Sequence, residues 1–85
     1  MPTEQLTPWE RWETAGDERT IVVHWTTNSA YRLQAVELEE SAQAVRVTVR
    51  EVIPDGPVTM MAAARQAEVR LEAPLAGREV VDGSR

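Results

Sequence analysis

The sequence contains no cysteine and no phenylalanine, and it has only four glycines and one histidine in 85 residues. Without cysteine the chain forms neither a disulfide framework nor a thiolate metal site, so apolar packing must stabilise the fold alone. None of the four glycines is arranged as a phosphate-binding loop between a strand and a helix. A lone histidine cannot form a multi-histidine metal site. We therefore expect no metal and no cofactor.

Long apolar runs are also missing, since no segment approaches the roughly 18 residues of a membrane span. The first residues, MPTEQLTPWE, lack the basic start and apolar middle of a secretory signal, which predicts a cytoplasmic protein. Nine basic and 14 acidic side chains give a net charge of −5, and this disfavours binding to nucleic-acid phosphates. We expect neither a membrane span nor a nucleic-acid partner.

The length of 85 residues is sufficient for one hydrophobic core. Residues 1–8 include Pro2 and Pro8 and few apolar side chains, which predicts a flexible N-terminal arm. The rest of the chain, residues 9–85, is interpreted as a single β domain. Its first part, residues 9–25, predicts a hairpin with Gly16 and Asp17 in the turn. A two-residue loop there places Trp12 opposite Ile21, and a longer loop changes that pairing.

The strongest local signal lies between residues 36 and 49, where VELEE and VRVTV alternate apolar and polar side chains around SAQA. A four-residue loop, 41–44, places Leu38 opposite Val47 and Val36 opposite Val49, with Glu39 opposite Arg46 on the other face. Near Ala35 the apolar side chains change from odd-numbered to even-numbered positions, which indicates a bulge or the start of a strand. Residues 54–57, PDGP, end the second arm.

Glu51 continues the inward phase of the valines that precede it. Either a bulge near Arg50 turns this carboxylate outward, or it lies at the margin of the core beside an arginine. We favour the bulge.

Two structures compete in the stretch TMMAAARQAEVRLE, residues 59–72. Its residues are good helix formers, with Thr59 as a possible N-cap. Residues 67–72 instead alternate between apolar and polar side chains, which predicts a strand preceded by a loop or one helical turn. A turn at residues 74–77 then leads to a last strand at 78–81. These elements predict an all-β domain, a five- or six-stranded antiparallel meander that forms a small sandwich or partly open barrel.

The order VELEE, VRVTVRE and AEVRLEAPLAGREVVDG resembles small uncharacterised β-domains of bacterial proteins, often lipoproteins, that end in a Pro-Leu, Gly-Arg, Val-Asp-Gly signature. The likeness covers residues 19–83. Many members of that group have paired cysteines, which this chain lacks. The resemblance supports the strand at residues 67–72 and implies no catalytic residue.

The side chains that could form a binding site are the aromatic residues, which all lie in the first 31 positions, and the histidine. They are Trp9, Trp12, Trp25, Tyr31 and His24. The aromatic residues either bind a partner or a flat ligand, or they close one end of the core, with Trp9 expected to be the most exposed tryptophan. Met60 and Met61 offer an adaptable contact surface or cover the core.

No nucleophile, base and orienting group can be assembled, so we expect no enzyme and no catalytic residue. The leading hypothesis is a noncatalytic module that binds a protein partner or forms a homo-oligomer, through a strand edge or through the tryptophan-rich side. The alternative is a small-ligand carrier with Trp12, Trp25 and Tyr31 around a pocket.

Overall fold

The computed structural model describes residues 2–58 and 60–85. The strands, in chain order, are β1 Thr3–Thr7, β2 Arg11–Thr14, β3 Thr20–Asn28, β4 Arg32–Glu40, β5 Ala44–Ile53, β6 Ala62–Arg70 and β7 Glu79–Asp82. None of the described residues is helical. The described part of the chain therefore includes no helix with the length and apolarity that crossing a bilayer requires.

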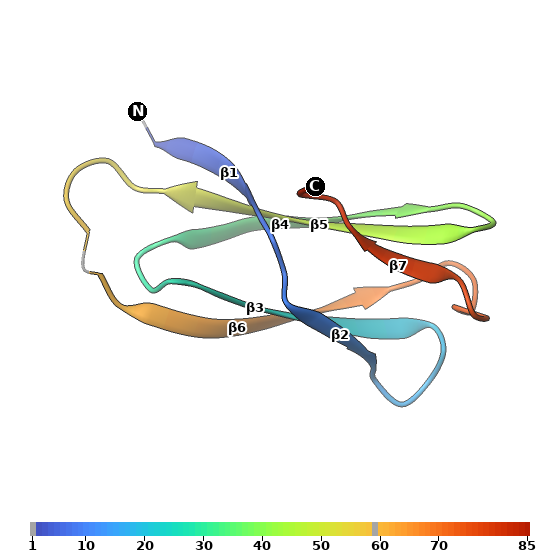
Figure 1. Ribbon diagram of the computed structural model, residues 1–85. Helices are drawn as coiled ribbons and strands as arrows, with labels where there is room; N and C mark the ends of the chain where they lie inside the picture. The colour runs from blue at the N-terminus through green and yellow to red at the C-terminus, as the bar shows by residue number, and fades with distance from the viewer. Residues whose placement is uncertain (1, 59) are drawn as a thin grey trace.

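Two sheets face each other as a sandwich (Figure 1). One sheet contains β4, β5, β1 and β7, and the other contains β2, β3 and β6. Neighbouring strands are antiparallel except β7, which runs parallel to β5. The predicted all-β antiparallel sandwich is confirmed, with seven strands in the described residues instead of five or six. The chain crosses between the sheets after β1, β3, β5 and β6, so only β2–β3 and β4–β5 keep the consecutive pairing of a meander.

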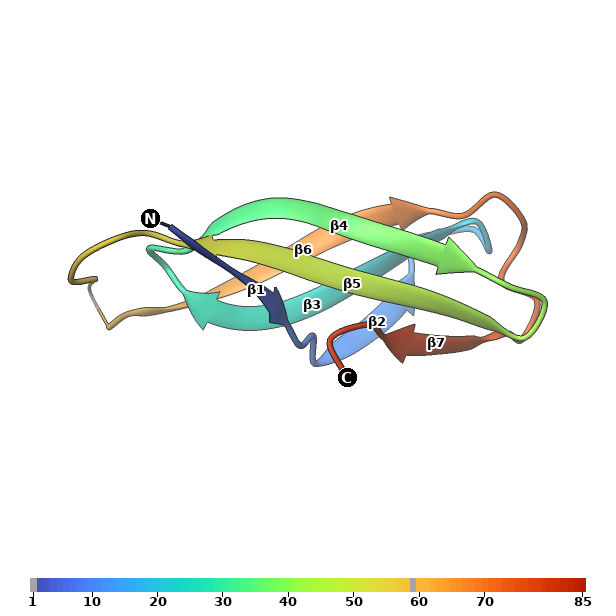
Figure 2. The same cartoon turned by 90° about the horizontal axis from the view of Figure 1, so that it is seen from above.

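Two short strands share one edge of β5. β1 pairs with residues 49–53 of β5, and β7 pairs with residues 44–47 (Figure 2). β1 occupies the segment in which we predicted a flexible arm, residues 1–8. The sequence TEQLT has too little apolar alternation to predict a strand, and its pairing depends on an edge that only the folded chain provides.

The β4–β5 hairpin confirms the predicted register. Leu38 lies opposite Val47 and Glu39 opposite Arg46, and Val36 lies opposite Val49. The predicted irregularity is also present, as a register shift between Leu33 and Ala35. β5 ends at Ile53, directly before the predicted break at residues 54–57.

The first hairpin has the longer loop that we considered, so the register that a two-residue loop predicts is wrong. Trp12 lies opposite Val23 and not opposite Ile21. The loop spans residues 16–19, and it is closed by the Ala15 N–H, which donates to the Thr20 carbonyl at 3.0 Å. Gly16 has a φ of 91°, a conformation that glycine adopts without strain. The two additional loop residues account for the shift in register.

β6 confirms the predicted strand over residues 67–70 and extends it back to Ala62. The alanine run is thus neither a loop nor a helical turn, because β3 pairs with β6 residue by residue along its whole length. Tertiary pairing outweighs the helix preference of alanine. Thr59, considered as a helix N-cap, lies outside the described residues. The last predicted strand, 78–81, is found one residue later as β7.

The core lies between the two sheets and is built by the inward-facing residues of β3, β5 and β6 together with two leucines that follow β6. Its buried members are Ile21, Val23, Trp25, Val45, Val47, Val49, Val69, Leu71 and Leu75. The period-two pattern of β3 and β5 therefore places their apolar side chains in one interior.

Candidate functional site

A carboxylate lies inside the sandwich, on the inner face of β5. Glu51 is 0% exposed. Its Oε1 accepts hydrogen bonds from the hydroxyls of Thr7 at 2.8 Å and Thr27 at 2.7 Å. Its Oε2 accepts hydrogen bonds from Arg65 Nη1 at 2.8 Å and Trp25 Nε1 at 3.4 Å. Donors from β1, β3 and β6 thus converge on this one residue, which satisfies a charge that would otherwise be costly to bury.

This arrangement overturns the bulge that we favoured near Arg50. β5 itself has no extra residue at this point: Glu51 pairs with Gln5 on β1 and Leu33 on β4, and the register shift opposite it places the extra residue, Gln34, in β4. The other prediction, a carboxylate beside an arginine, is the one the structure shows. Because Glu51 is closed off from solvent, it joins the two sheets and offers no group to a substrate.

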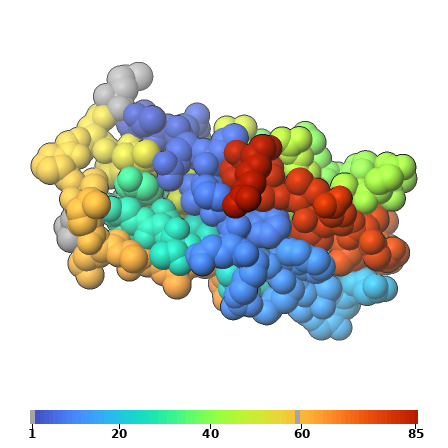
Figure 3. All heavy atoms as spheres, viewed as in Figure 1, coloured from blue at the N-terminus to red at the C-terminus, as the bar shows by residue number. Residues whose placement is uncertain are grey.

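Trp9 seals the junction between β1 and β7. Its indole N–H donates to the Val47 carbonyl at 3.0 Å, and its backbone N–H donates to Asp82 Oδ2 at 3.1 Å. Figure 3 shows the C-terminal residues packed over the N-terminal segment on this side. Trp9 is half-buried, whereas Trp12 is 38% exposed, so the expectation that Trp9 is the most exposed tryptophan is wrong.

The predicted aromatic residues do not form one site. Trp25, on the inner face of β3, is buried beside Glu51, while Trp12 lies on the exposed strand β2. Tyr31 follows the turn between β3 and β4, where its N–H donates to the Asn28 carbonyl at 3.0 Å. The hollow beside His24 is lined by Trp25 but by neither Trp12 nor Tyr31.

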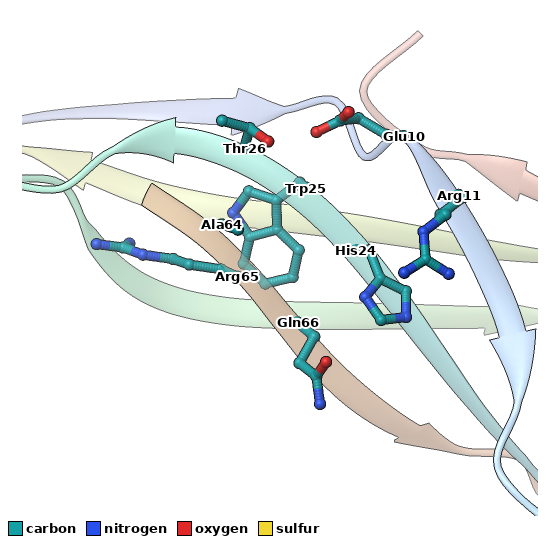
Figure 4. A pocket seen from close by; sticks show the side chains of 8 residues that line it. All are labelled: Glu10, Arg11, His24, Trp25, Thr26, Ala64, Arg65 and Gln66. Atoms are coloured by element: carbon teal, nitrogen blue, oxygen red, sulfur yellow. The ribbon is translucent and has the colours of Figure 1, made fainter. Parts of the chain in front are cut away.

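His24 lies in a shallow hollow of about 440 Å³ on the outer face of the β2–β3–β6 sheet (Figure 4). Arg11 and Gln66 flank it. Its Nε2 is 3.4 Å from Glu13 Oε1, which is an ion-pair distance, but no hydrogen bond to Nε2 is formed within the described residues. The hollow is open and mixes charges of both signs. Nowhere in residues 2–58 and 60–85 do three or more histidine, aspartate or glutamate side chains gather to hold a metal ion.

Arg78 and Glu40 tie the tip of the β4–β5 hairpin to the connection between β6 and β7. Arg78 donates to Glu40 Oε1 at 3.2 Å and to the carbonyls of Ser41, Ala73, Pro74 and Leu75. Glu40 also accepts the Glu72 N–H at 2.8 Å, and this bond, with the Arg78 contact, lowers the pKa of its carboxyl. Sequence reasoning missed this cluster, because Glu40 is 32 positions from Glu72 and 38 positions from Arg78.

Four strand edges delimit the two sheets, and they differ in what they offer a partner. β2 is four residues long, and β1 and β7 are short. β4 is interrupted by its bulge and has exposed glutamates, Glu37 and Glu39. Bulges and charges are devices that block edge pairing. β6 is nine residues long and pairs with β3 without interruption. It is therefore the longest regular edge in the described part of the chain.

The hydrogen bonds at the two ends of the β3–β6 ladder show which backbone groups of β6 face outward. The Ser29 N–H donates to the Met61 carbonyl, and the Leu71 N–H donates to the Arg19 carbonyl. Bonding residues alternate in an antiparallel ladder, so the odd-numbered residues of β6 bond to β3 and the even-numbered ones point away from it. The β6 edge is defined here as the outward N–H and C=O groups of five residues: Ala62, Ala64, Gln66, Glu68 and Arg70.

An exposed apolar segment precedes this edge. Met60 is 90% exposed and Met61 is 60% exposed. Ala62 and Ala64 are also exposed, so residues 60–64 present an uncharged surface that continues into the strand. Large exposed apolar side chains grouped beside an unpaired strand edge are typical of interaction surfaces.

Comparison with family models, curated proteins and solved structures finds no match to this chain. The resemblance to bacterial β-domains therefore stays a prediction.

Proposed function

We propose that this domain is a noncatalytic interaction module that accepts an extended segment of a protein partner along the β6 edge. The observation that supports the proposal most directly is the direction of the backbone groups of β6, which point alternately toward β3 and away from it. Five consecutive even-numbered residues direct both backbone groups away from β3, with no bulge and no proline in the strand. Added strands obtain their affinity from such main-chain hydrogen bonds.

The surface around the edge supports the same proposal. The uncharged half, residues 60–64, allows a partner backbone to approach closely, because alanine side chains are small. Met60 and Met61 provide flexible apolar contacts that adapt to different side chains. Glu68 and Arg70, at the other end of β6, supply charges that set the register of the added strand.

A catalytic role has less support. Glu51 is enclosed by its four donors, and among the residues that the structure describes His24 has only Glu13 as an ionisable partner within ion-pair distance. The small-ligand alternative needs Trp12, Trp25 and Tyr31 around one pocket, and these residues lie apart.

The proposal can be tested with a displayed library of linear nine-residue peptides, selected for binding to the whole chain. Peptides that bind the β6 edge lose affinity for Ala64→Pro, because proline removes one outward N–H and leaves the bonds to β3 intact. The matched control, Ala64→Thr, keeps the N–H and is expected to retain binding. Circular dichroism confirms that both variants keep the sheet structure.

Should Ala64→Pro unfold, Ala62→Pro makes the same test at the first residue of the strand, where proline is tolerated. Selected peptides that bind both proline variants as well as the unmodified chain would contradict the proposal. A library that yields no binder would also contradict it.

A further inference from the structure

We propose that the segment that pairs with the β6 edge is β6 of a second copy of this chain, in an antiparallel arrangement with a two-fold axis at Gln66. This inference rests on the proposed function and names its partner. It follows from the distribution of side chains along β6, which is complementary to itself when the strand direction is reversed.

The two halves of β6 differ in size and charge. Residues 62–64 are three alanines, whereas the opposite end has the long charged side chains of Glu68 and Arg70. An antiparallel copy places the small half of one strand against the charged half of the other. Each charged side chain then lies over an alanine, which leaves it room to extend across the neighbouring strand into solvent.

Symmetric pairing centred on Gln66 uses the whole strand. Glu68 lies opposite Ala64 of the second copy, and Arg70 lies opposite its Ala62. The two Gln66 residues face each other, and their side-chain amides can bond across the axis. All five residues of the β6 edge find partners, which forms about ten backbone hydrogen bonds.

Other symmetric registers are less favourable. Centring on Arg65 or on Glu68 places like charges directly opposite each other, which destabilises a strand pair. Centring on Ala67 leaves Ala62 and Ala63 without strand partners and loses about two hydrogen bonds. Registers that place an inward residue opposite an outward one conflict with the alternation of the sheet. The register at Gln66 combines full length with the absence of direct like-charge pairs.

An inward-pointing charge on an edge strand usually blocks pairing, because a new neighbour would bury it. β6 has such a charge in Arg65, but its guanidinium is already bonded to Glu51 at 2.8 Å. Pairing with a second copy therefore buries an ion pair that exists beforehand instead of a free charge. On this inner face Arg65 lies opposite Ala67 of the second copy, and Ala63 lies opposite Val69.

The resulting dimer has one continuous six-stranded sheet built from two β2–β3–β6 sheets. Each copy has a net charge of −5, so the two copies repel each other at low ionic strength. Added salt screens this repulsion. The dimer is therefore expected to become tighter between 20 mM and 500 mM salt, a direction opposite to that of a contact formed by ion pairs.

Sedimentation velocity over a range of concentrations tests the dimer with the full chain. A monomer–dimer equilibrium is expected, and Ala64→Pro should raise its dissociation constant at least tenfold, since it removes one hydrogen bond at each of two symmetric positions. Ala64→Thr, which keeps the N–H, should change it less than threefold. A strictly monomeric chain, or a dimer that Ala64→Pro leaves unchanged, would overturn the proposal.

Disulfide trapping tests the register separately. Because the chain contains no cysteine, single-cysteine variants give an unambiguous result. In the proposed register the Cα atoms of residue 66 lie about 5.5 Å apart, a distance that a disulfide can bridge. Gln66→Cys should crosslink readily under mild oxidation. Glu68→Cys is the control and should remain uncrosslinked, because it faces Ala64.

The two proposals fail in different ways. A monomer that shows no crosslink at residue 66, but binds selected peptides through the β6 edge, would contradict the proposed dimer and support the proposed interaction module. A dimer that crosslinks through Glu68→Cys and not through Gln66→Cys would also contradict the proposed register. A chain that neither dimerises nor binds peptides would remove both proposals.

Discussion

Arg65 Nη1 lies 2.8 Å from Glu51 Oε2, and this ion pair joins an edge strand of one sheet to the central strand of the other. The same carboxylate accepts hydrogen bonds from the hydroxyls of Thr7 on β1 and Thr27 on β3. Glu51 is thus the point at which both sheets and the N-terminal strand are connected. Its position also keeps Arg65 of β6 neutralised beside the edge that we propose as the interaction surface.

Replacing Glu51 with glutamine should destabilise the fold by about 3 kcal/mol, because Arg65 loses its counter-charge and an amide N–H₂ then faces donor groups. Urea unfolding at neutral pH measures this change. Glu37→Gln is the matched control, since the Glu37–Arg50 pair lies at the surface, and it should cost less than about 1 kcal/mol. Similar costs for the two variants would contradict the role given to Glu51.

A double-mutant cycle separates the ion pair from the remaining contacts. Glu51→Gln and Arg65→Met should be coupled by more than about 1 kcal/mol, because either change alone leaves the other charged or polar group unpaired. Unfolding free energies of the two single variants and the double variant give the coupling. Additive costs would show that the two side chains act independently.

Trp9 and Trp12 should respond differently to the same substitution. Trp9→Phe removes the indole donor to the Val47 carbonyl and should cost about 1 kcal/mol, while the ring still packs. Trp12→Phe, at an exposed position, should change the stability by less than about 0.5 kcal/mol. Unfolding monitored by circular dichroism avoids the loss of tryptophan fluorescence. A larger effect at Trp12 would contradict the assignment of Trp9 as the residue that seals the junction.

The Glu40 carboxyl should contribute pH-dependent stability. Its pKa is lowered in the folded state, first by the Glu72 N–H and further by Arg78. Because the pKa is lowered by folding, the ionised carboxyl stabilises the folded state. Its contribution to stability is complete above the ordinary glutamate pKa of about 4.5 and is lost as the pH falls through the lower pKa of the folded state. The difference in urea midpoint between the unmodified chain and Glu40→Gln should therefore shrink from pH 7 to pH 3. A constant difference would contradict this linkage.

The sequence alone predicts the parts of the fold in which local pattern and pairing agree. Alternation on both sides of residues 41–44 predicts the β4–β5 hairpin and its register. The β2–β3 register is missed, because the strand pattern does not define where the loop ends. The polar segment of β1 and the alanines of β6 have no strand pattern of their own, and they become strands through neighbours that only the folded chain brings to them.

The candidate sites were harder to predict than the fold. The alternation of apolar and polar residues indicates that Glu51 points into the core. The cost of burying a carboxylate nevertheless favours a bulge that turns it outward. Donors from β1, β3 and β6 offset that cost, and their convergence cannot be seen in any one segment. The β6 edge was likewise hidden, because which strands lie at the edges depends on the order of strands in the sheets.

Amide hydrogen exchange along β6, followed by NMR at low and high protein concentration, tests the central claim most directly. In the dilute protein the N–H groups of Ala64, Gln66 and Glu68 should exchange rapidly, while those of Arg65 and Ala67 are protected by β3. As the concentration rises, the three even-numbered amides should become protected in step with dimer formation. Even-numbered amides that exchange at the same rate in the concentrated protein, or that are already protected in the monomer, would contradict a free β6 edge that pairs with a second copy.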